Sequence, residues 1–158
     1  MVTRRRRVNG DNRDDLAIGV PYEDIPGVVN AGAVNVIYGP LGFAGNQIWT
    51  QNTFGVLDVA EANDLFGMAL TVGDFNGDNR DDLAIGVPNE DWGAVADAGA
   101  VNVLYGAAGG LSAVNNQFWS QTTAGVLDVV EAGDAFGRSL AAGDFNSDGR
   151  DDLAVGVP

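Results

Sequence analysis

An internal repeat of 67 to 70 residues constrains this chain more than any other feature of its sequence. Residues 9–21 (NGDNRDDLAIGVP) are identical to residues 76–88, and residues 146–158 (NSDGRDDLAVGVP) differ from them at three positions. Two further pairs of segments recur in step with these: residues 31–39 with 98–106, and residues 55–70 with 125–140. Repetition at a fixed period of this size is the signature of a stacked or radial repeat architecture.

Each period contains four short segments with the pattern of β-strands. In the middle copy these are residues 83–87, 99–105, 117–121 and 138–145, the last of which leads into the next acidic loop. The three extra residues of the longer period fall between Gly106 and Asn116, in a stretch rich in Gly, Ala and Ser that we interpret as a loop. Four short strands per period, without helical periodicity, predict an all-β chain of four-stranded antiparallel propeller blades.

The repeat boundaries predict about two blades, of which both terminal ones are incomplete. Residues 1–8 are expected to be a tail or a truncated strand, and residues 9–64 a partial blade. Residues 65–135 are expected to form a complete blade with its connection, and residues 136–158 the first two strands of the next blade.

The acidic loop of the middle copy has the oxygen pattern that Ca²⁺ prefers. Side-chain oxygens stand at loop positions one, three, five and nine, and a backbone carbonyl is wanted at position seven. The residues are Asp74, Asn76, Asp78, Arg80 (through its carbonyl) and Asp82. An EF-hand would continue as a helix to a Glu at position twelve, but Ile85 stands there and a strand follows. The sequence therefore predicts a calcium loop between two strands.

The same pattern is complete in the last copy and incomplete in the first. The last copy offers Asp144, Asn146, Asp148, Arg150 (through its carbonyl) and Asp152. The first keeps Asn9, Asp11, Arg13 and Asp15, but Arg7 stands where the acid of position one belongs. We expect the first loop to bind calcium weakly or not at all. Asp81 and Asp151 lie between ligand positions and are expected to face solvent or to cap the turn.

The pairing of these loops with two short motifs resembles a known family. Phe66-Gly67 before the loop and Gly86-Val87-Pro88 after it resemble the FG-GAP repeat, which forms the β-propeller head of integrin α chains and recurs in bacterial secreted and surface proteins. The resemblance implies that calcium lies in the hairpin between the first and second strands of a blade. It also implies an extracellular or cell-surface location. Integrin heads have seven blades in one chain, whereas about two are present here.

Composition narrows the classes of function. The formal net charge is −14, from 22 acidic and 8 basic residues, which disfavours nucleic acid and anionic membranes as partners and favours divalent cations. No apolar run approaches the roughly 20 residues of a membrane span, and no apolar segment of a signal peptide follows the basic N-terminus. The short basic run from Arg4 to Arg7 is more typical of a disordered tail than of an anion site. Cysteine is absent, so no disulfide is expected.

Two other groups of residues could carry chemistry, and repeat architecture accounts for both. Paired carboxylates occur at Glu23-Asp24 and Glu90-Asp91, and a set of aromatic residues that could stack on sugars comprises Trp49, Phe66, Trp119 and Phe136. Their positions are equivalent between repeats, so we interpret the aromatic residues as core between blades. Without His, a Ser–His–Asp triad is impossible. We expect no enzymatic activity.

The sequence thus predicts a calcium-stabilised interaction scaffold. The alternatives are a lectin-like propeller that binds carbohydrate and an accessory domain of a secreted hydrolase. Unpaired strand edges on the two incomplete blades favour head-to-tail assembly into a ring of three or four chains, with six or eight blades. One strand is then supplied twice, by residues 15–20 and 152–157, and we expect the N-terminal copy to be displaced.

Overall fold

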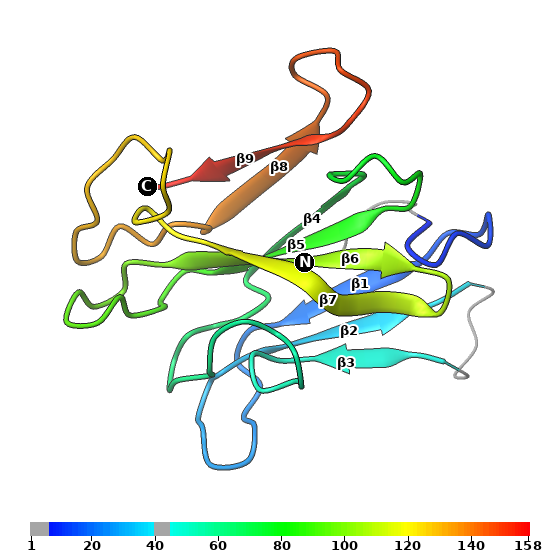
Figure 1. The fold of residues 1–158 in the computed structure, drawn as a ribbon. Coiled ribbons are helices and arrows are strands. Elements are labelled where there is room, and N and C mark those ends of the chain that lie inside the picture. The colour runs from blue at the N-terminus through cyan, green and yellow to red at the C-terminus, as the bar shows by residue number, and fades with distance from the viewer. Residues whose placement is uncertain (1–6, 40–44) are drawn as a thin grey trace.

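The chain folds into three antiparallel β-sheets without a helix in the part that the structure describes, residues 7–39 and 45–158 of a computed structural model (Figure 1). This confirms the predicted all-β fold of antiparallel blades. Within the same residues, no helix is long and apolar enough to cross a membrane.

The three sheets correspond to one blade each. The first blade has the strand order β1 (Leu16–Val20), β2 (Ala33–Ile37) and β3 (Gln47–Trp49). The middle blade consists of β4 (Ala69–Gly73), β5 (Asp82–Val87), β6 (Ala100–Ala107) and β7 (Gly110–Trp119), paired in sequence order. The last blade is the hairpin of β8 (Ser139–Gly143) and β9 (Asp152–Gly156).

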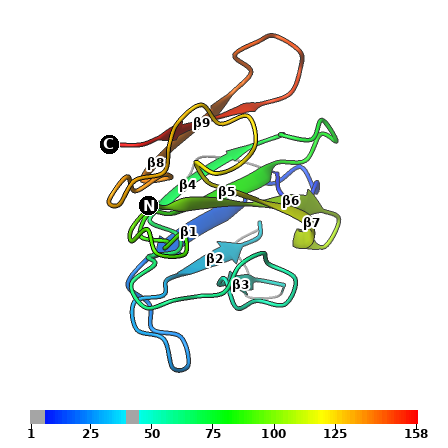
Figure 2. The same ribbon diagram turned by 60° about the vertical axis from the view of Figure 1, so that its left-hand side comes forward.

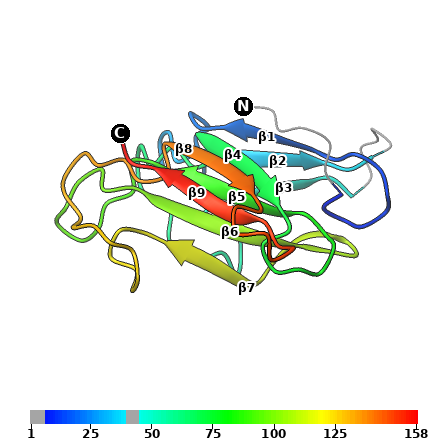
Figure 3. The same ribbon diagram turned by 90° about the horizontal axis from the view of Figure 1, so that it is seen from above.

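The blades are layered one on another as in a propeller. The first, middle and last sheets follow one another across the molecule in two views (Figures 1 and 2). Strand β4 contacts β8 on one side and β1 on the other, and the view from above shows β7 at the opposite edge of the middle sheet (Figure 3). Strand β4, which opens the middle blade, is therefore its inner strand, and the acidic loops all project from the same end (Figure 1).

Alternation along the strands builds two cores, one on each face of the middle blade. On β5, Leu83 and Ile85 face the core shared with the first blade, whereas Ala84 belongs to the core shared with the last blade. Every residue of β5 is buried, because this strand is covered on both faces. The larger core contains Phe66, Leu70, Val34, Trp49 and Leu111, all buried.

Glycines in the two recurring motifs let neighbouring blades approach backbone to backbone. A Cβ atom on Gly86 would lie 2.1 Å from the carbonyl oxygen of Gly137, and one on Gly19 would lie 2.0 Å from that of Gly67. The amide of Gly137 donates in turn to the carbonyl of Gly156 at 3.2 Å. The Phe-Gly turn of one blade therefore packs on the Gly-Val-Pro strand of the blade before it.

The predicted loop between Gly106 and Asn116 is wrong. Strand β7 begins at Gly110, runs through most of that stretch and ends at Trp119, so that only a tight turn separates it from β6. Leu111 is buried against the first blade, where its amide donates to the Tyr38 hydroxyl at 2.7 Å and its carbonyl accepts from Gln47 Nε2 at 3.0 Å. Packing between blades thus holds small and polar residues in a strand that their propensity does not favour.

Val8 is the last residue of the segment that was expected to be a tail or a truncated strand. Val8 is only 4% exposed and belongs to the larger core. The amide of Gly10 donates to the carbonyl of Arg7 at 3.2 Å, so that both residues form the beginning of the first acidic loop. Arg4, Arg5 and Arg6 lie outside the described residues.

Candidate calcium loops

The acidic loop of the middle blade joins β4 to β5 and is shaped by its own side chains. Asp74 accepts hydrogen bonds from the amides of Gly77 (2.7 Å) and Asp78 (3.0 Å) through Oδ1. Oδ2 of Asp74 accepts from the amide of Asn79 at 2.8 Å. The backbone has positive φ at Gly77 (79°) and Asn79 (63°), which turns the chain tightly. The glycine and asparagine of the motif are residues that adopt this conformation at low cost.

Positions three and five continue the same frame. The Oδ1 of Asn76 accepts from the amide of Asp78 at 2.8 Å, and the Oδ1 of Asp78 accepts from the amide of Arg80 at 2.8 Å. The second carboxylate oxygen of Asp78 lies 3.6 Å from Arg80 Nη1, at a half-exposed position. Asp74, Asn76 and Asp78, three of the predicted ligands, therefore lie on the same tight turn.

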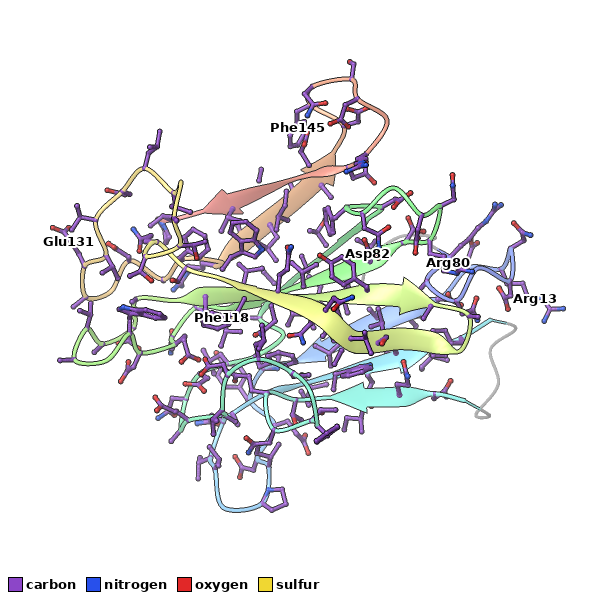
Figure 4. All side chains as sticks on the ribbon, in the orientation of Figure 1. Arg13, Arg80, Asp82, Phe118, Glu131 and Phe145 are labelled. Carbon is purple, nitrogen blue, oxygen red and sulfur yellow. The ribbon has the colours of Figure 1, made fainter. Side chains whose placement is uncertain are left out.

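Asp82 closes the loop from the first residue of β5 and is completely buried. Its carboxylate accepts from the amides of Phe75 (3.0 Å) and Gly106 (2.9 Å). Burial raises the pKa of Asp82 to about 6, and the nearby charges of Asp78 and Asp74 contribute to the rise. The three carboxylates of Asp74, Asp78 and Asp82 therefore lie close enough for their negative charges to act on one another. Asp82 and Arg80 are labelled in Figure 4.

The loop of the last blade, between β8 and β9, repeats this frame. Asp144 accepts from the amides of Asp148 (3.1 Å) and Gly149 (3.0 Å), and Asp152 accepts from that of Phe145 at 2.9 Å. The amides of Asp148 and Arg150 also donate, to Asn146 Oδ1 (2.8 Å) and Asp148 Oδ1 (2.9 Å). Positive φ falls at Ser147 (62°) and Gly149 (87°). This loop is exposed, and Phe145 near its beginning is 65% exposed (Figure 4).

The first loop keeps part of the frame. Asn9 accepts from the amide of Asp11 at 3.0 Å, Asp11 from that of Arg13 at 2.8 Å, and Asp15 from that of Gly39 at 3.0 Å. Arg7 occupies position one, and its Nη1 donates to Asn12 Oδ1 at 3.0 Å, where Asp74 accepts from Asn79 in the middle loop. A cation therefore holds the turn that a carboxylate holds in the other two.

The residues of the two complete loops fit calcium by their chemistry. Each loop combines three carboxylates, an amide oxygen and a carbonyl on a single turn, which is a donor set for a hard cation. In the described part of the chain, no group of three or more Asp, Glu, His or Cys side chains is arranged to hold a metal ion. The carboxylates point to loop amides instead. Calcium binding therefore requires Asp74 and Asp144 to exchange some of these amides for the ion.

The structure gives Asp81 and Asp151 a role that the sequence did not reveal. The carboxylate of Asp151 accepts from the amide of Asp74 at 3.0 Å, and the amide of Asp151 donates to the carbonyl of Asp74 at 2.9 Å. Asp81 accepts from the amide of Arg7 at 2.6 Å in the same way. The residue at position eight of one loop thus clamps position one of the loop before it. Its recurrence beside each ligand set was the only signal in the sequence.

The two carboxylates of the pair Glu90-Asp91 have different surroundings and make separate hydrogen bonds. Glu90 is 5% exposed and its Oε2 accepts from Gln51 Nε2 at 2.8 Å, whereas Asp91 is exposed and accepts from the amide of Asp97 at 2.8 Å. Burial raises the pKa of Glu90 far above its usual range, and the neighbouring Asp58 raises it further. Glu23, the counterpart of Glu90 in the first copy, is exposed.

The aromatic residues form packing between blades, as predicted. Trp49 (7% exposed) and Phe66 (0%) lie in the larger core, and Phe136 (6%) lies in the smaller one. Trp119 is partly buried and lines a groove of about 460 Å³ with Phe75, Val103 and Leu153.

Known proteins resemble this chain along most of its length. Mouse phosphatidylinositol-glycan-specific phospholipase D is 34% identical over 96% of the chain, and human phosphatidylinositol-glycan-specific phospholipase D is 33% identical over the same share. Mouse integrin alpha-8 is 31% identical over 94%. The chain spans 17% of the length of each phospholipase and 12% of the integrin.

A solved structure with a similar fold is the rhamnogalacturonan lyase PL11 of Bacillus licheniformis. It superposes on 99% of this chain with a TM-score of 0.54 at 14% sequence identity, and the chain covers 28% of it. At this identity the likeness concerns the fold alone.

A profile of the FG-GAP repeat matches residues 8–37, 66–104 and 136–158, one match for each blade. The matches include the acidic hairpins, the Phe-Gly turns and the Gly-Val-Pro strands whose contacts hold the blades together. The chain therefore belongs to the FG-GAP repeat family of β-propeller blades.

Proposed function

We propose that this chain is a calcium-binding propeller segment that acts as a protein-interaction scaffold without chemistry of its own. The observation that carries the proposal is the hydrogen-bonded frame shared by the two complete acidic loops. In both, the first, third and fifth residues accept amides of the same turn. The two loops present the same oxygen ligands in the same order, which supports two calcium sites of one kind.

Calcium would be held by side-chain oxygens and one carbonyl in each loop. The proposed ligands are Asp74, Asn76, Asp78, the Arg80 carbonyl and Asp82 in the middle loop, and Asp144, Asn146, Asp148, the Arg150 carbonyl and Asp152 in the last loop. Burial is the main cause of the raised pKa of Asp82, and the charges of Asp78 and Asp74 add to it; a bound divalent ion would neutralise this shared charge. The contribution of the ion is structural, because it would fix the hairpin of the middle blade, whose Asp74 amide donates to Asp151 of the last blade.

The interaction role includes assembly with further copies of the chain. Among the described residues, β1 and β9 each pair with one neighbouring strand, so the first and last blades expose strand edges there. Such edges pair readily with other chains. We propose a head-to-tail ring of three or four chains with six or eight blades, acting outside the cell or at its surface in keeping with the integrin resemblance.

A second candidate is an accessory domain of a hydrolase. The phospholipase D relatives favour it, since they are as similar to this chain as the integrin. The two functions differ in what the propeller touches. A scaffold binds a protein, whereas an accessory domain in such an enzyme would contact the catalytic domain or its glycan-bearing substrate.

Calcium should stabilise the fold in thermal melts, which tests the metal proposal. Binding to the native loops and not to the unfolded chain adds about 2.7 kcal/mol at a free calcium concentration 100 times the dissociation constant. For a chain of this size we expect the melting temperature with calcium to exceed that with chelator by several degrees. Isothermal titration should count two ions per chain.

Three aspartate variants provide the control for this measurement. Asp78→Ala and Asp148→Ala should each reduce the stoichiometry from two ions to one. Asp11→Ala is the matched change in the first loop, where Arg7 replaces an acid, and should leave both the stoichiometry and the calcium-dependent shift unaltered. Melts that coincide with and without calcium would contradict the proposal.

A further inference from the structure

The boundary between the first and middle blades contains a buried polar contact. Gln51, at the end of the first blade, is 1% exposed, and its Nε2 donates to Glu90 Oε2 at 2.8 Å. Glu90, which follows β5 of the middle blade, is 5% exposed. Burial of an amide or a carboxyl is costly unless the group is hydrogen-bonded, so the buried Gln51 amide needs a partner such as the Glu90 carboxyl.

The connection after Gln51 forms a second set of contacts across the same boundary. The Nδ2 of Asn102 on β6 donates to the carbonyl of Leu57 at 2.9 Å, and the amide of Leu57 donates to Asn116 Oδ1 at 3.0 Å. Leu57 is 46% exposed as a result of this packing. The first blade thus meets its neighbour through one buried Gln–Glu contact and a backbone segment held by asparagines.

The middle blade presents the equivalent residues, with Gln121 buried but unpaired and Leu127 exposed. Gln121, the equivalent of Gln51, is 3% exposed, and neither its Nε2 nor its Oε1 has a hydrogen-bond partner among the described residues. Leu127, the equivalent of Leu57, is 99% exposed. The adjacent groove of about 460 Å³ is lined by Trp119, Val126 and Leu153.

The first blade presents the complementary residues. Glu23 is exposed and makes no side-chain hydrogen bond in the described part of the chain, although its backbone has the contacts of Glu90: its amide donates to Val20 at 3.1 Å and its carbonyl accepts from Gly32 at 2.9 Å. Asn35 on β2 is the equivalent of Asn102 and is only half-buried. A groove of about 450 Å³ beside Glu23 is lined by Ala33, Ile48 and Thr50.

We propose that these two surfaces bind each other between copies of the chain, with Glu23 of one copy accepting the hydrogen bond that Gln121 of the next donates. Asn35 of the same copy then holds the carbonyl of Leu127. This contact rests on the proposed ring and specifies the residues that close it. It is heterologous, as a ring requires.

A second copy is the occupant that the observations favour. Residues 31–36 (AGAVNV), which contain Asn35, are identical to residues 98–103, which contain Asn102. The surface of the first blade therefore repeats, residue for residue, much of the surface that already binds Gln51 and Leu57 within the chain.

The experiment compares the assembly of the whole chain with its stability, by sedimentation velocity over a concentration series and by thermal melts at fixed calcium. Gln121→Met removes an amide that has no partner in the single chain. It should weaken assembly at least about tenfold while leaving the melting temperature of the dilute chain unchanged or higher. Gln51→Met is the matched control. It breaks a contact within the chain and should lower the melting temperature without weakening assembly to the same degree.

Exchange of the two partners provides a second test. Gln121→Glu places two carboxyls against each other and should weaken assembly, and the double variant Gln121→Glu/Glu23→Gln restores the pair and should recover assembly to within about threefold of wild type. If wild type assembles but Gln121→Met and Gln121→Glu assemble equally well, the contact is wrong and the ring stands. If wild type is a monomer at every concentration, the ring itself is wrong.

Discussion

Glu23 and Glu90 occupy the same place in two copies of the repeat, yet their surroundings differ completely. Glu90 is enclosed by the first blade and lies beside Gln51, Asp58 and Asp64, and its pKa is raised mainly by burial. The pKa of Asp64 is raised to about 6 for the same reason. Glu23 is exposed, because no other blade covers it among the described residues. The neighbouring blade, not the residue or its local sequence, therefore determines how deeply this carboxyl is buried.

The raised pKa of Glu90 predicts that stability falls as the pH rises. Below the ordinary value of about 4.5 the carboxyl is protonated in both folded and unfolded chains, so its contribution to stability is fully present. Above it the unfolded chain ionises while the folded chain holds its proton, and stability is lost progressively across neutral pH. Glu90→Gln keeps a neutral side chain of the same size and should stabilise the protein at pH 8 by about 1–3 kcal/mol, with little effect at pH 4.

Chemical denaturation at the two pH values, at constant free calcium, measures this difference. Glu131→Gln provides the control because Glu131 is exposed. An equal effect of Glu90→Gln at both pH values would show that the carboxyl is ionised in the folded chain, contrary to the burial argument.

Between elements, the spacing of the blades depends on glycine where β5 meets the Phe-Gly turn of the last blade. A Cβ on Gly86 would lie 2.1 Å from the carbonyl oxygen of Gly137, which is too short for any tolerated contact. The carbonyl belongs to the backbone and cannot move aside as a flexible side chain could. The same arrangement at Gly19 and Gly67 shows that this contact is repeated at each boundary. The Phe-Gly and Gly-Val-Pro motifs thus form the two sides of one joint.

Gly86→Ala should separate the last blade from the middle one. We expect a loss of about 1–3 kcal/mol or more in the free energy of unfolding, since a buried methyl group has no space there. Gly109→Ala is the control, because a Cβ at Gly109 meets nothing within 4 Å. Urea denaturation compares the two variants, and an equal stability for both would refute the close approach of these backbones.

For the whole molecule, the strand inventory limits the number of chains that can form a ring. Each chain supplies one complete blade and parts of two others, and propellers have about four to eight blades. In the described chain both β1 and β9 are paired, β1 with β2 and β9 with β8, so the expected displacement of residues 15–20 concerns the assembly and stays a prediction.

Native mass spectrometry should find assemblies of three or four chains, with masses that are those multiples of the 16.3 kDa of one chain. These correspond to six or eight blades, because each chain contributes the equivalent of two. An assembly with any other number of chains would contradict the way the terminal blades are proposed to merge. Calcium should favour the ring, because the ion orders the hairpins at its joints.

The sequence by itself determined the architecture of this protein because the information is repeated and local. The strand pattern, the Phe-Gly turn and the donor order from Asp74 to Asp82 recur at one period, and a tight turn built by its own side chains folds alike wherever it occurs. The ligand roles of these residues stay a prediction, although the frame that carries them is present in the structure.

Only the tertiary structure decided which side chains are buried or paired at the boundaries between neighbouring blades. Gln51 and Gln121 are the same residue type at equivalent positions, and they differ because Gln51 pairs with Glu90 whereas no described residue pairs with Gln121. The clamp from Asp151 to Asp74 and the extension of β7 to Gly110 likewise arise from contacts between blades. Propensity and spacing describe a segment of chain, whereas burial and pairing are properties of the surfaces that meet after the chain has folded.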